Sequence, residues 1–147
     1  MTATAHALVG GAIAASVSNP ALGLPLCALS HPILDMIPHW DFGWGWQKKS
    51  KLKLFVQASF DLSLGVVATF LIFGKATDPL YLASAIFLSE IWDLLQMPYL
   101  LFNWKFTPFS AFYNLGHDIQ GKVKLPWGIL TQAITVGGVV FALRTLH

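Results

Sequence analysis

The chain has 147 residues, of which 55% are hydrophobic and only 11% are charged, and it has a net charge of +2 and a single cysteine. Soluble domains have about 25% charged residues. The composition therefore excludes a disordered chain, a charged nucleic-acid-binding tail and a disulfide scaffold. It predicts an all-α, polytopic integral membrane protein that forms one domain over 1–147 and has no nucleic acid partner.

Apolar runs between turn residues predict five helices. A membrane-spanning helix needs about 20 apolar residues. The apolar runs cover 4–18, 21–38, 52–74, 79–101 and 125–145. Because the first run is short, four spanning helices are the alternative to five. Two longer polar segments remain, 40–51 and 103–124, and the second is expected to form a turn of interfacial helix over 109–119.

Basic residues predict which side of the membrane the polar segments face. Seven of the nine lysines and arginines lie in or beside the two long segments: Lys48, Lys49, Lys51, Lys53, Lys105, Lys122 and Lys124. Loops rich in lysine and arginine stay in the cytoplasm. The pattern therefore predicts an inner-membrane protein whose long segments and N-terminus are cytoplasmic.

The end of the second predicted helix carries ionisable residues at helical spacing. His31, Asp35 and His39 follow at i, i+4 and i+8, which places them on one face of a helix. Along a regular helix, His31 and His39 are about 12 Å apart, too far to bind one metal ion easily. Either Asp35 lies between two sites, or the helix breaks near Pro38 and lets His39 and Asp41 fold back.

Other ionisable residues are predicted at a similar depth in other segments. They are His6 in the first helix, Asp61 in the third, Glu90 and Asp93 at i, i+3 in the fourth, and His117 in the second polar segment. The outer half of the membrane domain is almost free of charged groups. The residues are therefore expected to form a cup that opens to the cytoplasm, not a pore.

Carboxylates crowded in a medium of low dielectric constant repel one another unless a cation neutralises them. Imidazole and carboxylate ligands together suit divalent zinc, with manganese or iron as alternatives, and the number of carboxylates allows one or two ions. The predicted metal ligands are His6, His31, Asp35, His39, Asp41, Glu90, Asp93 and His117. The predicted catalytic residues are Glu90 and Asp93, as ligands or general base, and Asp61, as ligand or orienting group.

These residues also have structural interpretations. Asp61 alone could hydrogen-bond a neighbouring helix. The His31, Asp35 and His39 group could form a polar network that joins helices. His117 lies in a loop, where a solvated histidine is ordinary. Four glycines are predicted to allow close helix packing in lipid: Gly10, Gly11, Gly137 and Gly138.

Two motifs lie in the N-terminal part of the chain. The segment 4–10 has the sequence Thr-Ala-His-Ala-Leu-Val-Gly, and 30–41 has Ser-His-Pro-Ile-Leu-Asp-Met-Ile-Pro-His-Trp-Asp. Together they resemble the family of membrane-bound metal-dependent hydrolases, in which a short first helix begins with a histidine and the second ends in a Leu-Pro-Asp-His type motif. The resemblance implies an inner-membrane hydrolase whose metal ligands include His6, Asp35, His39 and Asp41.

The remainder of the chain departs from that family's pattern. It lacks a later His-Arg-Gly-x-Thr-His stretch, so either Glu90, Asp93 and His117 replace it or the kinship is remote. The His-x-x-x-Asp-x-x-x-His spacing is also similar to that of zinc-dependent phospholipases of the C type. This similarity concerns only the choice of substrate.

These expectations give one leading function and two alternatives. The leading hypothesis is a membrane-embedded, metal-dependent hydrolase that cleaves a lipid or lipid-linked phosphoester or ester at the cytoplasmic interface. The first alternative is a divalent-metal or proton-coupled transport protein, which needs an exit route through the apolar outer half. The second is a non-catalytic partner in a membrane assembly, with another chain in the cup.

Overall fold

The computed structural model describes residues 1–145, and the chain is all-helical over this range. Seven α-helices and the short 3₁₀ helix Trp46–Lys48 are found in these residues. The α-helices are α1 (Ala3–Ser16), α2 (Pro20–Asp35), α3 (Lys51–Phe73), α4 (Pro79–Ser89), α5 (Ile91–Phe102), α6 (Phe109–Ile119) and α7 (Trp127–Thr145). The predicted all-α class is confirmed, and α6 is the helix predicted over 109–119.

Four helices begin at a polar side chain that caps the first turn. Such a side chain satisfies a backbone amide that has no partner inside the helix. The capping oxygens of α1, α2, α3 and α4 accept these hydrogen bonds at 2.9–3.3 Å, and belong to Thr2, Asn19, Ser50 and Asp78. The gaps between the predicted apolar runs at 19–20 and 75–78 therefore contain the residues that cap α2 and α4.

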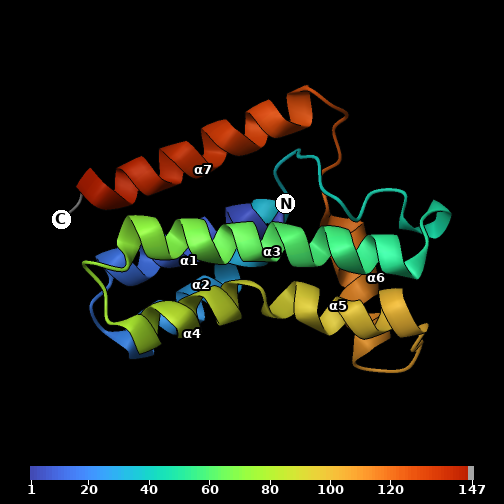
Figure 1. Cartoon of the computed structure of the whole chain (residues 1–147), viewed down its shortest axis with the longest axis horizontal. Helices are drawn as coiled ribbons and strands as arrows, with labels where there is room; N and C mark the ends of the chain where they lie inside the picture. The colour runs from blue at the N-terminus through green and yellow to red at the C-terminus, as the bar shows by residue number, and fades with distance from the viewer. Residues whose placement is uncertain (146–147) are drawn as a thin grey trace.

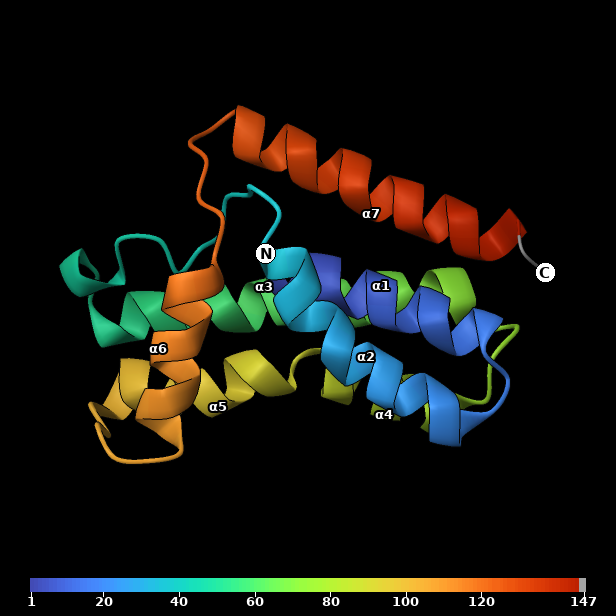
Figure 2. The ribbon, with the colours of Figure 1, turned by 180° about the vertical axis from the view of Figure 1, so that it is seen from behind.

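The helices form two groups along the length of α3 (Figure 1). In the first, α1, α2 and α4 pack together beside one half of α3, and in the second, α5 and α6 pack together beside the other half. α1 contacts α2, α3, α4 and α7, and α7 lies over α1 when the molecule is seen from behind (Figure 2). We call the first group the packed half, and the second group with the loop 40–50 the open half.

Glycines allow α1 to lie close to its neighbours. A Cβ atom on Gly10 would lie 2.8 Å from the Ser89 Oγ atom of α4, and one on Gly65 would lie 2.8 Å from the Thr4 Cα atom of α1. The predicted close packing is therefore confirmed for Gly10. The prediction is wrong for Gly137 and Gly138 of α7. A Cβ atom on either glycine would have no atom of residues 1–145 within 4 Å.

The outer surface of the bundle is apolar. Four residues on one face of α2 are 47–62% exposed: Leu22, Leu26, Leu29 and Ile33. Large apolar surfaces mark contact with lipid or with another protein. Among residues 1–145, α3 and α7 are long and apolar enough to cross a membrane, and a third span results if α4 and α5 form one.

The five predicted spans are therefore only partly matched. α1 has 14 residues, and a helix of this length is about 21 Å long, whereas the hydrocarbon core of a bilayer is about 30 Å thick. α1 is therefore too short to cross the bilayer core as a straight helix, which was the reason for the alternative of four spans. A total of five spans stays a prediction.

The segment predicted as one helix over 79–101 forms two. α4 and α5 meet at Glu90 with a bend of 49°, so the prediction of one continuous helix is wrong. The His31 Nδ1 atom of α2 donates a hydrogen bond to the Ser89 carbonyl oxygen at 2.6 Å. Because helices bend where a side chain enters the hydrogen-bond ladder, the contact with α2 accounts for the break.

α2 ends at Asp35, three residues before the predicted end at residue 38. The chain then pairs with the segment that precedes α7. The His39 amide donates to the Gly121 carbonyl at 3.0 Å, and the Val123 amide donates to the His39 carbonyl at 3.0 Å. The helix is therefore broken before Pro38, and the position of His39 is fixed by residues outside α2.

Candidate metal centre

Three parts of the chain meet at the boundary between the packed half and the open half. The first turns of α1 carry His6, the end of α2 carries His31 and Asp35, and the break between α4 and α5 carries Glu90, with Asp93 in the first turn of α5. All of these side chains except Asp93 are buried. The structure therefore brings together ionisable groups that the sequence places on different helices.

His31 directs its Nε2 atom toward two carboxylates. Its Nδ1 atom donates to the Ser89 carbonyl oxygen, which can only accept a hydrogen bond, so Nδ1 carries a proton. Nε2 lies 3.4 Å from Asp35 Oδ2 and 3.6 Å from Asp93 Oδ1. It has no hydrogen-bond partner among the described residues, which leaves this nitrogen available as a ligand.

His39 approaches Asp35 from the other side. Its Nδ1 atom donates to the Ile37 carbonyl at 2.7 Å, the kind of bond that orients metal-binding histidines. Its Nε2 atom lies 3.7 Å from Asp35 Oδ1 and 3.5 Å from Asp41 Oδ2. His39 and Asp41 therefore fold back beside Asp35, as expected for a helix that breaks near Pro38.

His6 reaches Asp35 from α1. Its Nε2 atom lies 3.2 Å from Asp35 Oδ1, and its ring stacks on that of His31 with centroids 3.7 Å apart. The N-terminal ammonium group of Met1 also contacts Asp35 Oδ1. Ligand atoms of His6, His31 and Asp35 all lie within 4.8 Å of one another, so this group could hold a metal ion.

The distances between these imidazoles and carboxylates can be compared with those of ion pairs and of metal ligands. A charged N–H···O hydrogen bond is about 2.7–2.9 Å long, whereas the Nε2 atoms of His31 and His39 lie 3.4–3.7 Å from their carboxylate neighbours. Two ligands of one tetrahedral zinc ion, each about 2.0–2.1 Å from the metal, are about 3.3 Å apart. This spacing is compatible with ligands of a common ion, and within residues 1–145 the group whose ligand atoms all lie close enough for one is His6, His31 and Asp35.

Glu90 and Asp93 add two carboxyl groups from the break in the α4–α5 pair. The Asp93 side chain is 39% exposed and lines the cavity described below. Glu90 is only 3% exposed, and its Oε1 atom has no hydrogen-bond partner within residues 1–145. A buried polar atom without a partner is unfavourable, and Glu90 shares this feature with the His6 Nδ1 and His31 Nε2 atoms of the cluster.

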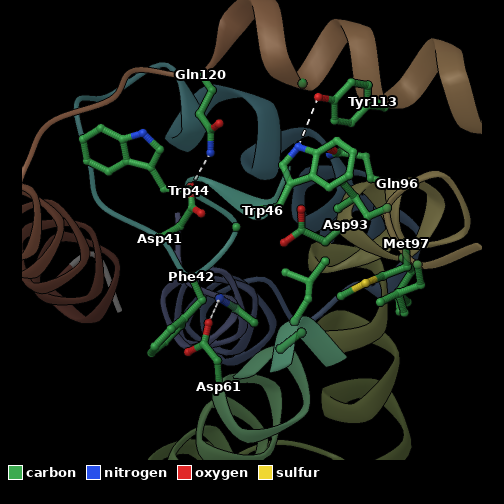
Figure 3. A pocket seen from close by; sticks show the side chains of 18 of the residues that line it. Asp41, Phe42, Trp44, Trp46, Asp61, Asp93, Gln96, Met97, Tyr113 and Gln120 are labelled. Carbon is green, nitrogen blue, oxygen red and sulfur yellow. Dashed lines mark hydrogen bonds between the residues drawn. The ribbon is translucent and has the colours of Figure 1, made fainter. Parts of the chain in front are cut away.

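A cavity of about 630 Å³ extends from the cluster into the open half. Figure 3 shows Asp41, Asp61 and Asp93 beside it, each from a different segment. Its remaining walls are largely apolar and aromatic and include Phe42, Trp44, Trp46, Leu62, Leu94 and Met97. Small-molecule sites have volumes of about 300–1,000 Å³ and similar linings, so the cavity is suited to a ligand with an apolar part.

The loop 40–50 forms one wall of the cavity and is tied to two helices. Trp46 Nε1 donates to the Tyr113 hydroxyl of α6 at 3.2 Å, and Lys49 Nζ donates to Gln57 Oε1 of α3 at 3.1 Å. Partial burial lowers the pKa of Lys49, although the nearby Asp41 carboxylate acts in the opposite direction. These contacts hold the aromatic wall in place.

Asp61, predicted as a ligand or orienting group, makes hydrogen bonds to α1. Its carboxylate accepts the Ala3 amide at 2.7 Å, the Thr4 amide at 3.2 Å and the Thr4 hydroxyl at 2.7 Å. Amides at the start of a helix need such acceptors. The contacts agree with the structural interpretation of Asp61, although the residue also lines the cavity.

His117, predicted as a metal ligand, lies apart from the other ligands. Its ring stacks on Tyr113, and its Nδ1 atom lies 3.2 Å from Lys122 Nζ. The side chain borders the cavity and is exposed. α6 places His117 at the wall of the cavity, so its role as a metal ligand stays a prediction.

Sequence reasoning missed Gln120. Its Nε2 atom donates to Asp41 Oδ2 at 2.5 Å and lies 3.3 Å from His39 Nε2. Gln120 reaches these groups because the chain beside it pairs with the segment after α2, through a bridge between His39 and Lys122. No local spacing in the sequence signals this pairing.

Comparison with known proteins gives no match to a protein-family model, a curated protein or a solved structure. The resemblance to membrane-bound metal-dependent hydrolases therefore depends on the two N-terminal motifs. The function has to be argued from the geometry of the cluster and its cavity.

Proposed function

We propose that this protein is a membrane-embedded, metal-dependent hydrolase that cleaves a lipid or lipid-linked phosphoester or ester. One observation carries the proposal: imidazole nitrogens from α1, α2 and the segment after α2 face carboxylates at the spacing of metal ligands. His31, Asp35 and His39 are the proposed core ligands. Zinc is the first candidate metal, with manganese or iron as alternatives.

An apolar substrate is supported by a second, smaller groove. The groove has a volume of about 240 Å³, lies between α3 and the α4–α5 pair, and is lined by apolar residues such as Val66, Phe70 and Phe87. Leu62, Glu90 and Leu94 line both this groove and the larger cavity. A hydrocarbon chain in the groove would have its polar end beside the cluster, which favours a lipid over a water-soluble substrate.

The proposed location is the inner membrane, with the N-terminus and the cluster facing the cytoplasm. α3 and α7 have the length and composition of spanning helices. Lys122 lines the cavity, Lys49 lies in the loop that forms its wall, and Lys51 follows that loop at the start of α3. Because lysine-rich loops stay in the cytoplasm, the cavity is proposed to open on that side.

The proposed chemistry is attack by water on a phosphorus or carbonyl centre. A bound divalent ion would lower the pKa of a water molecule and polarise the ester. Asp93 is the most accessible carboxylate of the cluster. It is proposed to take a proton from the water molecule while the water oxygen bonds to the phosphorus or carbonyl carbon. Glu90 is proposed to return a proton to the leaving alcohol as the ester bond breaks. The aromatic wall would limit access of bulk water.

Metal analysis of the purified protein tests this proposal. The affinity tag is placed at the C-terminus, because Met1 is buried at the cluster. We expect the protein in the membrane fraction, at least one divalent transition metal per chain, and hydrolysis of bis(p-nitrophenyl) phosphate or a p-nitrophenyl ester of a fatty acid.

Two matched variants sharpen this test. Asp35→Asn should lose both the metal and the activity, whereas Asp118→Asn, at an exposed position of α6, should keep both. A parent protein without stoichiometric metal contradicts the proposal, and so does an Asp35→Asn variant that retains its full metal content.

A further inference from the structure

We infer that the far end of the open half binds anionic lipid, through a patch of aromatic side chains and the lysines around it. Four rings at the connection between α5 and α6 form this patch, and neighbouring ring centroids are 5.3–5.8 Å apart: Phe102, Trp104, Phe106 and Phe109. We call these four residues the aromatic patch. Lipid binding there needs no metal ion, so it is separate from the proposed hydrolysis.

The aromatic patch is exposed although its side chains are large and apolar. Phe102 is 64% exposed, Phe106 is 56% exposed and Trp104 is 45% exposed. Within residues 1–145, none of the four rings belongs to the buried apolar core. Contiguous exposed apolar surfaces mark contact with lipid or with another protein, so the position and the charge of the patch have to decide between these partners.

The position of the aromatic patch favours lipid. α3 is long and apolar enough to cross a membrane, and Lys51 is its first residue. The Lys51 Nζ atom donates to the Asn103 Oδ1 atom at 3.3 Å and to the Leu100 carbonyl oxygen. Figures 1 and 2 both show the start of α3 beside the connection between α5 and α6. Tryptophan and phenylalanine are typical of surfaces that lie in the membrane–water interface, where spanning helices end.

The charge around the aromatic patch favours anionic lipid over neutral lipid. The segments 42–60 and 94–117 contain five lysines and no aspartate or glutamate. Four of these lysines are exposed: Lys48, Lys51, Lys53 and Lys105. The acidic residues that bound the two segments lie at the cavity or near the other end of α6: Asp41, Asp61, Asp93 and Asp118. An anionic membrane surface attracts each nearby lysine by about fivefold in affinity, or about 1 kcal/mol.

The lysines differ in what else they contact. Lys51 joins α3 to the end of α5, and its Nζ atom lies 5.1 Å from the centroid of the Trp46 ring. A substitution of Lys51 would therefore disturb the fold of the open half. Lys105 follows Trp104 within the aromatic patch and is exposed, so its charge can be removed without changing these contacts. Phe102 also lines the cavity, so a lipid bound at the patch would lie next to it.

Quenching of tryptophan fluorescence by brominated lipids tests the inference. The full chain is reconstituted in phosphatidylcholine vesicles that contain brominated phosphatidylglycerol or, at the same mole fraction, brominated phosphatidylcholine. Bromine quenches the tryptophans that it contacts, so we expect stronger quenching by the anionic lipid. The difference should shrink at high salt, which screens exposed charges. It should also shrink in Trp104→Phe, which keeps an aromatic ring but lacks the reporter.

Two matched variants test the role of charge. Lys105→Gln should weaken the preference for phosphatidylglycerol about fivefold. Lys75→Gln removes an exposed charge between α3 and α4, beyond the other end of α3, and should leave the preference unchanged. Equal quenching by the two lipids in the unmodified protein, or equal losses in the two variants, overturns the inference.

Two further outcomes separate this inference from its rivals. Protection of Trp104 from both brominated lipids would overturn it in favour of a patch covered by protein, such as a second copy of the chain. Neither metal content nor hydrolysis enters the measurement. A chain that binds no metal would therefore contradict the proposed function and leave the lipid-binding patch standing.

Discussion

The packed half and the open half share α3 but bury different kinds of groups. In the packed half, Leu82 and Ala85 of α4 are fully buried, and the Tyr81 hydroxyl donates to the Val17 carbonyl at 2.7 Å. In the open half, a cavity of about 630 Å³ lies where a core would otherwise form. The buried imidazoles and carboxylates are concentrated where the two halves meet.

This difference indicates a division of roles. The packed half holds His6, His31 and Asp35 on helices whose positions are fixed by close contacts, and the open half provides access to them. Binding sites are held more precisely by helices than by loops. Changes in the packed half should therefore alter stability, and changes at the boundary should alter metal binding.

Removal of the proposed metal has the largest expected effect. A ligand present at about a thousand times its Kd stabilises the native state by about 4 kcal/mol, so a chelator should lower the free energy of unfolding by that order. Denaturant titration in detergent micelles measures the loss. Asp35→Asn serves as the control, since chelator should not change its stability. An equal response of the variant and the parent would show that the boundary is not the metal site.

Asp61→Asn should destabilise the contact between α1 and α3. Asparagine keeps only one acceptor oxygen, so it loses either the bond from Ala3 or the bonds from Thr4, which Asp61 accepts at different oxygens. Hydrogen bonds to charged groups contribute about 1.5–3 kcal/mol. Unfolding experiments should show a loss of this size while the metal content stays unchanged. A loss of metal or activity without a loss of stability would instead support the predicted role of Asp61 in the site.

Gly10→Ala should destabilise the packed half by about 1–3 kcal/mol, the usual cost of overpacking. The added Cβ atom would lie 2.8 Å from Ser89 Oγ and 3.1 Å from the Ala85 carbonyl. The matched control is Gly137→Ala, which meets open space and should stabilise α7 by about 0.5–1 kcal/mol. Thermal unfolding compares the two variants. Similar stabilities for both would refute the assigned difference in packing.

Tyr81→Phe should have the smallest effect, about 1 kcal/mol, because it removes one neutral hydrogen bond, to the Val17 carbonyl. The bond lies in the packed half away from the cluster. The variant should unfold at a slightly lower denaturant concentration and bind metal as the parent does. A change in metal affinity would mean that the packed half and the boundary are coupled.

Local signals predicted most of the helices. Asn19 with Pro20, and Asp78 with Pro79, mark helix starts that the structure confirms. The break at Glu90 was not predictable, because no proline or glycine lies between Pro79 and Pro98. Its cause is the hydrogen bond from His31, a residue 58 positions away from Ser89.

The site was predictable in part. The spacing of His31, Asp35 and His39 indicated a shared face or a folded-back end, and the structure has the folded-back end. His117 and Gln120 show the limit of spacing arguments. Both residues lie in the polar segment 103–124, yet only Gln120 contacts His39 and Asp41. The pairing of the segment after α2 with the segment before α7, and not the residue type, brings Gln120 close to them.

The sequence by itself determined the helical class, the apolar character and the starts of the helices, because caps, prolines and apolar runs act on residues close together in the chain. Only the tertiary structure decided that His6 and His39 meet at Asp35 and that Asp93 faces His31. Those contacts depend on the packing of α1, α2 and α5 and on a helix break that another helix imposes, and no local pattern encodes such distances.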